Sequence, residues 1–282
     1  MFDISGINWQ VNRERILILG AARSLLMQIA HPLIAAAVDR HSRFREDPMG
    51  RLRRTMETMA IILFGTAGEA RSAADQLRSI HAGVRGALHE RTGDYRAGAR
   101  YYANDPELLF WVHATLVDTS MLVFRVFVRE LSTAEQELYY QGSTKIARLY
   151  GIPDSVIPRN LRDFRDYIDR MIYAGPIAVG DTARELARHI LRPNVPMPTA
   201  LGTSIIGFAS VGLMPPKLRD DFGLGWGPAR QFVLDASALA SRMILPILPD
   251  ALRVAPAARA AEMDAREPCV RGSRRWMPVS ET

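Results

Sequence analysis

Cysteine and lysine are nearly missing from this 282-residue chain. Its one cysteine, Cys269, excludes an internal disulfide framework, a thiolate zinc cluster and a four-cysteine iron–sulfur site. Lys145 and Lys217 are the only lysines among the 36 basic residues, so 34 of these residues are arginines. A GC-rich coding sequence explains most of them. Some could bind an anionic group, because the planar guanidinium bonds carboxylate or phosphate through two parallel hydrogen bonds.

Several common catalytic motifs are also missing. The sequence has no glycine-rich phosphate loop, no G-x-S-x-G nucleophile turn and no H-E-x-x-H pair. The net charge of +6 is modest for the length and the arginines are interspersed with acids, so we expect no nucleic-acid partner. The remaining candidates for chemistry are six histidines: His31, His41, His81, His89, His113 and His189.

The composition predicts a folded, helical protein. Hydrophobic residues make up 48% of the chain and charged residues 23%, which is too apolar for a disordered chain. Strand-like alternation with tight hairpin turns is absent, and helix-capping signals recur. We therefore predict a single all-α domain of about 9–11 helices over residues 1–264. The arginine-rich tail, residues 265–282, is predicted to be disordered.

Capping signals give the expected bounds of the helices. Thr66 with Glu69, and Ser132 with Glu135, have the spacing of a capping box, and Asp105 precedes a proline. Helices are predicted over residues 12–30, with a break at His31-Pro32, and then over 32–40, 48–64, 67–90, 105–130, 133–151, 160–173, 181–191, 199–213 and 228–245.

Two apolar stretches, residues 16–38 and 108–128, are long enough to approach the span of a bilayer. Charged and polar side chains interrupt both, and such groups are costly in lipid. We expect two buried core helices in a cytoplasmic protein, and we recognise no targeting segment. Peripheral contact with a membrane is an open alternative.

His81 is the most informative histidine. On a continuous helix it would share an apolar face with Leu77 and Val84, and Arg78 and Arg85 would flank it on neighbouring turns. One imidazole between cations on an apolar face suits haem, which needs an axial nitrogen, apolar walls and partners for its propionates. The alternative is a core histidine bonded to the backbone, with two snorkelling arginines.

A second polar cluster precedes it. Arg51, Arg54 and Thr55 occupy positions i, i+3 and i+4 of the helix that ends near Gly65. The tight turn predicts an antiparallel helical hairpin, which would bring this cluster to a depth similar to that of His81. The alternative is a solvated basic face.

His113 lies in a helix that is apolar nearly all round, so it is predicted to be buried and to need a partner. It could be an axial ligand, an acid/base that lines a pocket, or a satisfied core histidine. Asp118 and Arg125 share a face of the same helix and are predicted to pair. His41, at a helix end near the first hairpin, could line the mouth of a pocket.

Three stretches, residues 30–44, 51–85 and 111–116, resemble the MpaB-like and latex-clearing (rubber oxygenase) family. The resemblance extends over roughly residues 15–240. Its most specific part is an Arg-x-x-Arg-Thr segment followed on the same hairpin by Arg-x-x-His-x-x-x-Arg, which are here Arg51, Arg54 and Thr55, and then Arg78, His81 and Arg85.

The resemblance implies an all-α, globin-like protein that binds haem b, with His81 as the proximal iron ligand and the Arg51–Thr55 cluster on the distal side. Characterised members use molecular oxygen to cleave carbon–carbon double bonds of isoprenoid chains. A haem with one histidine ligand leaves one face open for oxygen, and an apolar cavity admits a hydrocarbon.

The sequence departs from latex-clearing proteins in two respects. Their distal lysine is here Arg54, a poor iron ligand because it stays protonated. Their catalytic glutamate has no counterpart in residues 34–38, and the nearest replacements are Asp39, His41, Glu46 and Asp47. Long rubber polymer is therefore a doubtful substrate, and a smaller molecule fits better.

We accordingly predict a haem b-dependent oxygenase that acts with O2 on an apolar, isoprenoid-like small substrate. His81 is the predicted iron ligand, and Arg78 and Arg85, with Leu77 and Val84, are predicted to surround the haem. The other candidate catalytic residues are Arg51, Arg54, Thr55, His41 and His113. The alternative is a non-catalytic haem-binding or lipid-binding helical protein.

Overall fold

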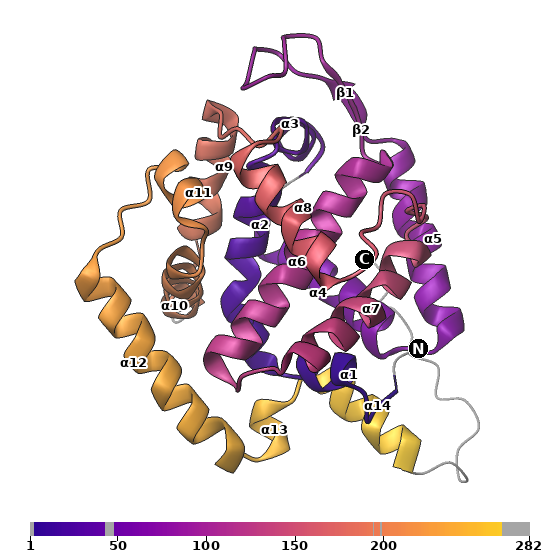
Figure 1. The fold of residues 1–282 in the computed structure, drawn as a ribbon, viewed down its shortest axis with the longest axis vertical. Coiled ribbons are helices and arrows are strands. Elements are labelled where there is room, and N and C mark those ends of the chain that lie inside the picture. The colour runs from indigo at the N-terminus through magenta and orange to yellow at the C-terminus, as the bar shows by residue number, and fades with distance from the viewer. Residues whose placement is uncertain (1–2, 43–47, 194, 198, 267–282) are drawn as a thin grey trace.

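A computed structural model describes residues 3–42, 48–193, 195–197 and 199–266 (Figure 1). This part of the chain contains 14 α-helices, two 3₁₀ helices and two strands of three residues. The all-α prediction is therefore confirmed, although the described residues form more helices than the 9–11 predicted. The elements are α1 (Ile7–Asn12), η1 (Arg15–Gly20), α2 (Ala21–Ile29), α3 (Pro32–His41), α4 (Pro48–Phe64), α5 (Ala67–Ala82), β1 (Arg85–Ala87), β2 (Arg100–Tyr102), α6 (Pro106–Phe127), α7 (Thr133–Leu149), α8 (Leu161–Tyr173), α9 (Asp181–Leu191), α10 (Thr199–Gly212), α11 (Pro216–Asp221), α12 (Pro228–Ile244), η2 (Leu245–Ile247), α13 (Asp250–Arg253) and α14 (Pro256–Arg266).

The first predicted helix, residues 12–30, is divided into parts. Glu14 takes an extended conformation and forms an isolated bridge with Val254, while its buried carboxylate accepts hydrogen bonds of 2.7–3.0 Å from Arg253. This long-range ion pair ends α1 before η1 and α2 begin. The predicted break at His31-Pro32 is confirmed, because Arg15–Ile29 and Pro32–His41 meet at 107°.

Helix α6 lies at the centre of the molecule, surrounded by η1, α1, α2, α7 and α12 (Figure 1). Its ring of buried side chains includes Trp111 and Phe124. Asp118 pairs with the buried Arg23 at 2.7 Å, and Arg125 pairs with Glu130, so the predicted Asp118–Arg125 pair is wrong. The sequence spacing gave no sign that α2 would bring a guanidinium to Asp118.

Length and composition alone would allow α6, and the bent pair Arg15–Ile29 with Pro32–His41, to cross a bilayer. In the fold, 61% of the apolar window of α6 is buried by the protein itself. The prediction of a core helix is confirmed for α6.

Helices α4 and α5 form the predicted antiparallel hairpin, and the capping box of Thr66 and Glu69 begins α5. Helix α5 ends at Ala82, however, and not at residue 90. After it, β1 pairs antiparallel with β2 in the register Gly86↔Tyr101, so the prediction of no strands is wrong. A side chain at residue 86 would collide with the Tyr101 hydroxyl, which explains why a glycine stands there.

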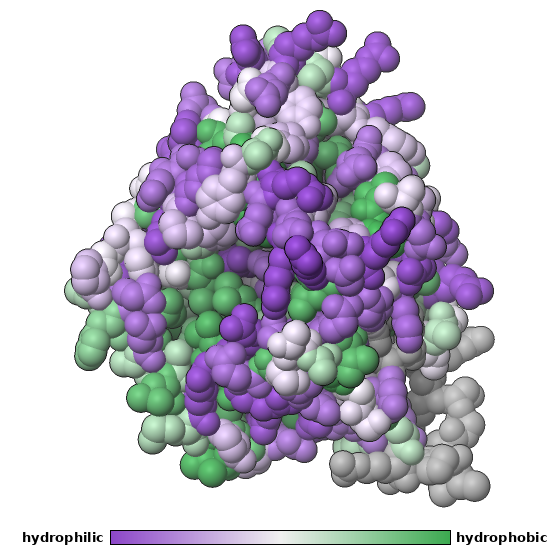
Figure 2. Space-filling model, in the orientation of Figure 1, coloured by the Kyte–Doolittle hydropathy of each residue, from purple (hydrophilic) through white to green (hydrophobic). Residues whose placement is uncertain are grey.

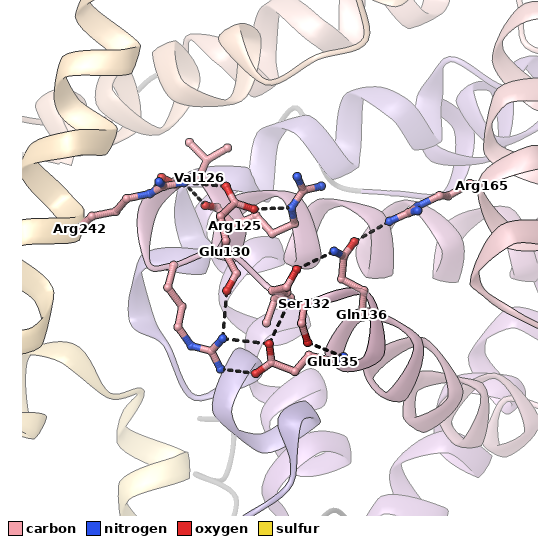
Figure 3. Close-up of polar contacts among 10 residues, drawn as sticks. Arg125, Val126, Glu130, Ser132, Glu135, Gln136, Arg165 and Arg242 are labelled. Carbon is pink, nitrogen blue, oxygen red and sulfur yellow. Dashed lines mark hydrogen bonds and ion pairs between the residues drawn. The ribbon is translucent and has the colours of Figure 1, made fainter.

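Helix α12 crosses the lower left edge of the molecule in Figure 1 and is fixed to the end of α6 by polar contacts (Figure 3). Arg242 donates to the Val126 carbonyl at 2.9 Å and pairs with Glu130 at 3.1 Å. The Ser241 hydroxyl donates to the Phe127 carbonyl at 2.8 Å.

Helices α1, α11, α13 and α14 were not predicted, since α1 shares only Asn12 with the predicted helix over residues 12–30. Helix α14 packs against α4, and the Trp9 indole donates to Glu262 at 2.7 Å. The predicted tail began at residue 265, whereas α14 runs through Arg266. The rest of that tail, residues 267–282, lies outside the described residues.

Candidate functional site

His81 lies in the last turn of α5, next to the Gly83 cap, and is partly buried. Its Nδ1 atom is shielded from solvent and has no hydrogen-bond partner in the described part of the chain. Burial lowers the pKa of the imidazole, which favours the neutral form at neutral pH. A neutral imidazole offers one lone pair, which is what a metal takes from histidine.

Arg78 and Arg85 do not flank His81 on one helix as predicted. Arg78 is on α5, where it pairs with Asp75 and lies beside Gly151. Arg85 belongs to β1, because the helix has already ended at Ala82. The same helix end removes Val84 from the predicted helical face, whereas Leu77 stays on α5, one turn before His81.

The Arg51–Thr55 cluster lies on the N-terminal half of α4. Arg51 is 14 residues before Gly65 and His81 is 16 after it, so the antiparallel hairpin brings them to the same end. Arg51 is partly buried, and both this burial and the nearby charge of Arg54 lower the pKa of its guanidinium. The hydroxyl of the exposed Thr55 donates to the Arg51 carbonyl at 3.0 Å. Arg54 is exposed.

His41, at the exposed end of α3, reaches the β-hairpin. Its Nε2 lies 3.2 Å from the Arg85 carbonyl, and its ring meets that of Tyr101 edge-on at 6.1 Å. Of the family glutamate's nearest replacements, Asp39 is exposed on α3, while Glu46 and Asp47 lie outside the described residues.

Two residues at this end of the molecule were missed by sequence reasoning. The hydroxyl of Tyr101 and Oδ1 of Asn104 are buried and lack partners among the described residues, as does Nδ1 of His81. The Asn104 amide donates to the Arg78 carbonyl at 3.0 Å, which ties the start of α6 to the last turns of α5. Asn104 directly precedes the helix cap Asp105, and its sequence neighbours do not signal its contact with α5.

His113 is buried in the core. Its ring lies 6.2 Å from Phe110 and 6.4 Å from Tyr150. Burial lowers the pKa of His113 to about 4, and a backbone hydrogen bond to Ser143 opposes this shift. This environment is that of a satisfied core histidine, one of the three readings of the sequence.

The described structure includes two hollows away from the α4–α5 hairpin. A narrow one of about 80 Å³ lies between α3, the β-hairpin and the start of α9, and includes Asp39, Arg40, His89 and Tyr101 in its lining. A more open one of about 430 Å³ lies between residues 154–159 and α8. Neither is lined by His81 or Arg51.

Within the described ranges, no three His, Cys, Asp or Glu side chains gather as a metal cage would require. The end of the α4–α5 hairpin instead presents one neutral imidazole, with the guanidinium of Arg51 on the facing helix. Such an arrangement suits a cofactor that needs a single protein ligand and bears negative charge.

A family model described as "ER-bound oxygenase mpaB/B'/Rubber oxygenase, catalytic domain" matches residues 9–243. The match spans the elements from α1 to α12 and includes the whole α4–α5 hairpin and β1–β2. Comparison with curated proteins found no match, and comparison with solved structures found none either.

Proposed function

The chain belongs to this family of oxygenase catalytic domains, and from that premise we propose that it is a haem b-dependent oxygenase in which His81 would ligate the haem iron. The proposed substrate is an apolar, isoprenoid-like small molecule that reacts with O2. The observation that carries the proposal is the Nδ1 atom of His81, which is buried and unpartnered within the described residues and belongs to a neutral ring.

The residues fit haem by their donor chemistry. A porphyrin supplies four nitrogen ligands to its iron, and the protein supplies a further ligand. A neutral His81 can be that ligand. Haem propionates need cations, and Arg78 on α5 and Arg85 on β1 lie three and four residues from His81 along the chain. Bound haem would supply an iron centre able to activate molecular oxygen.

Arg51, Arg54 and Thr55 would shape the side of the site opposite His81. Arginine stays protonated and donates hydrogen bonds without ligating iron, so Arg54 would leave the oxygen side open. Thr55 carries a hydroxyl that can both donate and accept, now directed to the Arg51 carbonyl. His41 would line the entrance of the substrate pocket. His113 is neutral and enclosed by apolar rings, so its role would be to hold α6 against α7.

The visible spectrum of the purified chain after haem supplementation tests the proposal. We expect a Soret band in the wild type and its loss, or at least a tenfold fall in haem content, in His81→Ala. His189→Ala, on the exposed side of α9, is the matched control and should keep the band. Unchanged haem content and an unchanged spectrum in His81→Ala would refute the assignment.

Oxygen uptake separates an oxygenase from a carrier. The reduced, haem-loaded protein should consume O2 faster when a short prenyl compound is added, and a carbonyl product should appear. Haem binding without any such uptake, across prenyl compounds of several lengths, would favour the alternative of a non-catalytic haem-binding or lipid-binding protein.

A further inference from the structure

The outward face of α12 is apolar and open to solvent. Its large exposed side chains, with their exposed fractions, are Phe232 (73%), Val233 (51%), Leu239 (63%), Met243 (68%), Ile244 (49%) and, in the adjoining η2, Ile247 (79%). Leu234 is the buried residue of α12, on the opposite side. In Figure 2 the hydrophobic surface gathers at the left and lower left, where Figure 1 shows α10 and α12.

The spacing of these residues is that of a helix-pairing seam. Phe232, Ala236, Leu239 and Met243 follow one another at intervals of four, three and four, which is the heptad pattern of positions d, a, d and a. Val233 and Ala240 extend the apolar face on one flank, at the e positions, and Ile247 of η2 follows them. We call the four seam residues with these three the α12 seam. It contains no charged or hydrogen-bonding side chain.

The size of the exposed face approaches that of a stable interface. Leu201 and Ile205 of the neighbouring α10 are also more than half exposed. At on the order of 100 Å² for each large side chain, the two helices offer roughly 600–800 Å². A stable pair of proteins buries about 800 Å² on each partner.

The charges beside the seam argue against a lipid surface. Interfacial helices place free Lys and Arg beside their apolar face. Here Arg242 is held by the Val126 carbonyl and Glu130 (Figure 3), and Arg230 donates to the Gly225 carbonyl. The exposed Asp235 borders the seam and would be repelled by anionic headgroups.

We propose that the α12 seam pairs antiparallel with the α12 seam of a second copy of this chain, across a two-fold axis. In this register Phe232 packs against the partner's Met243, and Ala236 against the partner's Leu239, so the small Ala236 faces a large side chain. Such an interface is self-complementary and closes after two copies.

Charge complementarity supports the antiparallel orientation. Asp235 and Arg242 both occupy g positions, and in antiparallel pairs g positions of the two helices face each other. Asp235 then lies near the partner's Arg242, and this contact would add to the bonds that Arg242 makes within its own chain to the Val126 carbonyl and Glu130. Symmetry repeats the contact. A parallel pair would instead bring the identical side chains of Phe232, and those of Met243, together in separate layers.

Sedimentation velocity of the full chain over about a hundredfold range of concentration, up to ~100 µM, tests the pairing. We expect a dimer that dissociates on dilution, and a monomer at every concentration for Leu239→Glu. Leu138→Glu is the matched control, because Leu138 of α7 is equally exposed (61%) and should leave the dimer intact. Circular dichroism should show the same helix content in all three proteins.

A wild-type monomer throughout this range would overturn the proposal. A dimer that survives Leu239→Glu would overturn it as well, since the seam would not be its interface. Flotation with phosphatidylcholine and phosphatidylserine vesicles completes the test. Wild-type flotation that is abolished by Leu239→Glu, with no dimer in solution, would assign the face to a bilayer instead.

Cysteine cross-linking tests the orientation in a Cys269→Ser background. The double variant Phe232→Cys with Met243→Cys should form disulfide-linked dimers under mild oxidation, because the two positions face each other in an antiparallel pair. Phe232→Cys alone should not, since the paired Phe232 positions would be about 16 Å apart along the seam. Efficient cross-linking of the single variant would overturn the antiparallel arrangement. None of these measurements depends on haem.

Discussion

His81 and His113 begin from the same kind of sequence, a histidine among apolar residues of a helix, and end in different surroundings. His113 is enclosed by Phe110 and Tyr150 and has Ser143 as a backbone partner. His81, at the end of α5, is only partly buried, and its Nδ1 is shielded with no partner within the described residues.

This difference separates a histidine that stabilises the fold from one that is available for chemistry. A buried polar atom without a partner costs the fold free energy, on the order of 1–3 kcal/mol. Native proteins accept this cost mainly where the atom is used, for example by a ligand. His113 instead lies buried among core side chains, which shield its ring from a ligand.

The enclosure of His113 makes His113→Ala the most damaging substitution of the pair for the protein without haem. It would leave a cavity beside Phe110 and Tyr150 and remove the partner of Ser143. We therefore expect the free energy of unfolding to fall by about 2–4 kcal/mol. His81→Ala should cost less than about 1 kcal/mol, because it removes an unsatisfied atom. Urea unfolding followed by circular dichroism measures both losses. Equal losses would remove the distinction between the two sites.

The lowered pKa of His113 predicts acid sensitivity. Its folded value of about 4 lies below the unfolded value of 6.5, so below pH 6.5 the unfolded chain binds a proton that the folded chain does not. The unfolding free energy should therefore fall by about 1.4 kcal/mol per pH unit from this group, between pH 6.5 and 4. His31, whose folded pKa is also about 4, adds a similar slope.

Unfolding by urea at pH 7.5, 6.0 and 5.0 measures this slope. His113→Gln should reduce the slope of the unfolding free energy with pH by the contribution of one histidine. His189→Ala, an exposed control, should leave this slope unchanged. A slope that is the same in His113→Gln and wild type would place the acid sensitivity elsewhere.

The helices next to the two histidines both begin with a capping box. Thr66 caps α5, which carries His81, and Ser132 caps α7, which supplies Ser143. Replacing either Thr66 or Ser132 by alanine should lower the free energy of unfolding by about 1 kcal/mol. In Ser132→Ala the remaining Glu135 keeps its 2.7 Å ion pair with Arg129.

Hydrogen exchange can show whether the two ends of the molecule open separately. Thr66→Ala should speed exchange mainly in α5, whereas Ser132→Ala should speed exchange through α6 and α7 together, because α7 packs on the core. Uniform acceleration in Thr66→Ala would mean that the His81 region unfolds only with the whole protein.

Local interactions made much of the fold predictable. The two capping boxes, and α9 from Asp181 to Leu191, depend on residues within a few positions of one another, and they form as predicted. The end of α5 was missed because it depends on β2, which lies some 15 residues further on. The Arg23–Asp118 pair joins residues 95 positions apart, a distance over which spacing gives no signal.

The candidate site likewise contains residues whose position the sequence predicts and residues whose position it does not predict. His81 and Arg51 could be placed at one end of a hairpin, since a tight turn fixes which residues of two helices face each other. Tyr101 and Asn104 reach this end through β2 and the start of α6, and their sequence neighbours give no sign of it. The contacts that a helix makes with distant segments depend on how side chains pack in the folded protein. A single sequence does not reveal this packing.

The central position of α6 has a consequence for synthesis on the ribosome. Its 22 residues, most of them apolar, are complete at Phe127, whereas α12, which covers part of this helix, is complete only at Ile244. At about 5–20 residues per second, part of this helix stays uncovered for roughly 6–23 s while the rest of the chain is made. The nascent chain therefore exposes for several seconds a surface that chaperones bind, and its yield should depend on them more than the finished protein's stability would suggest.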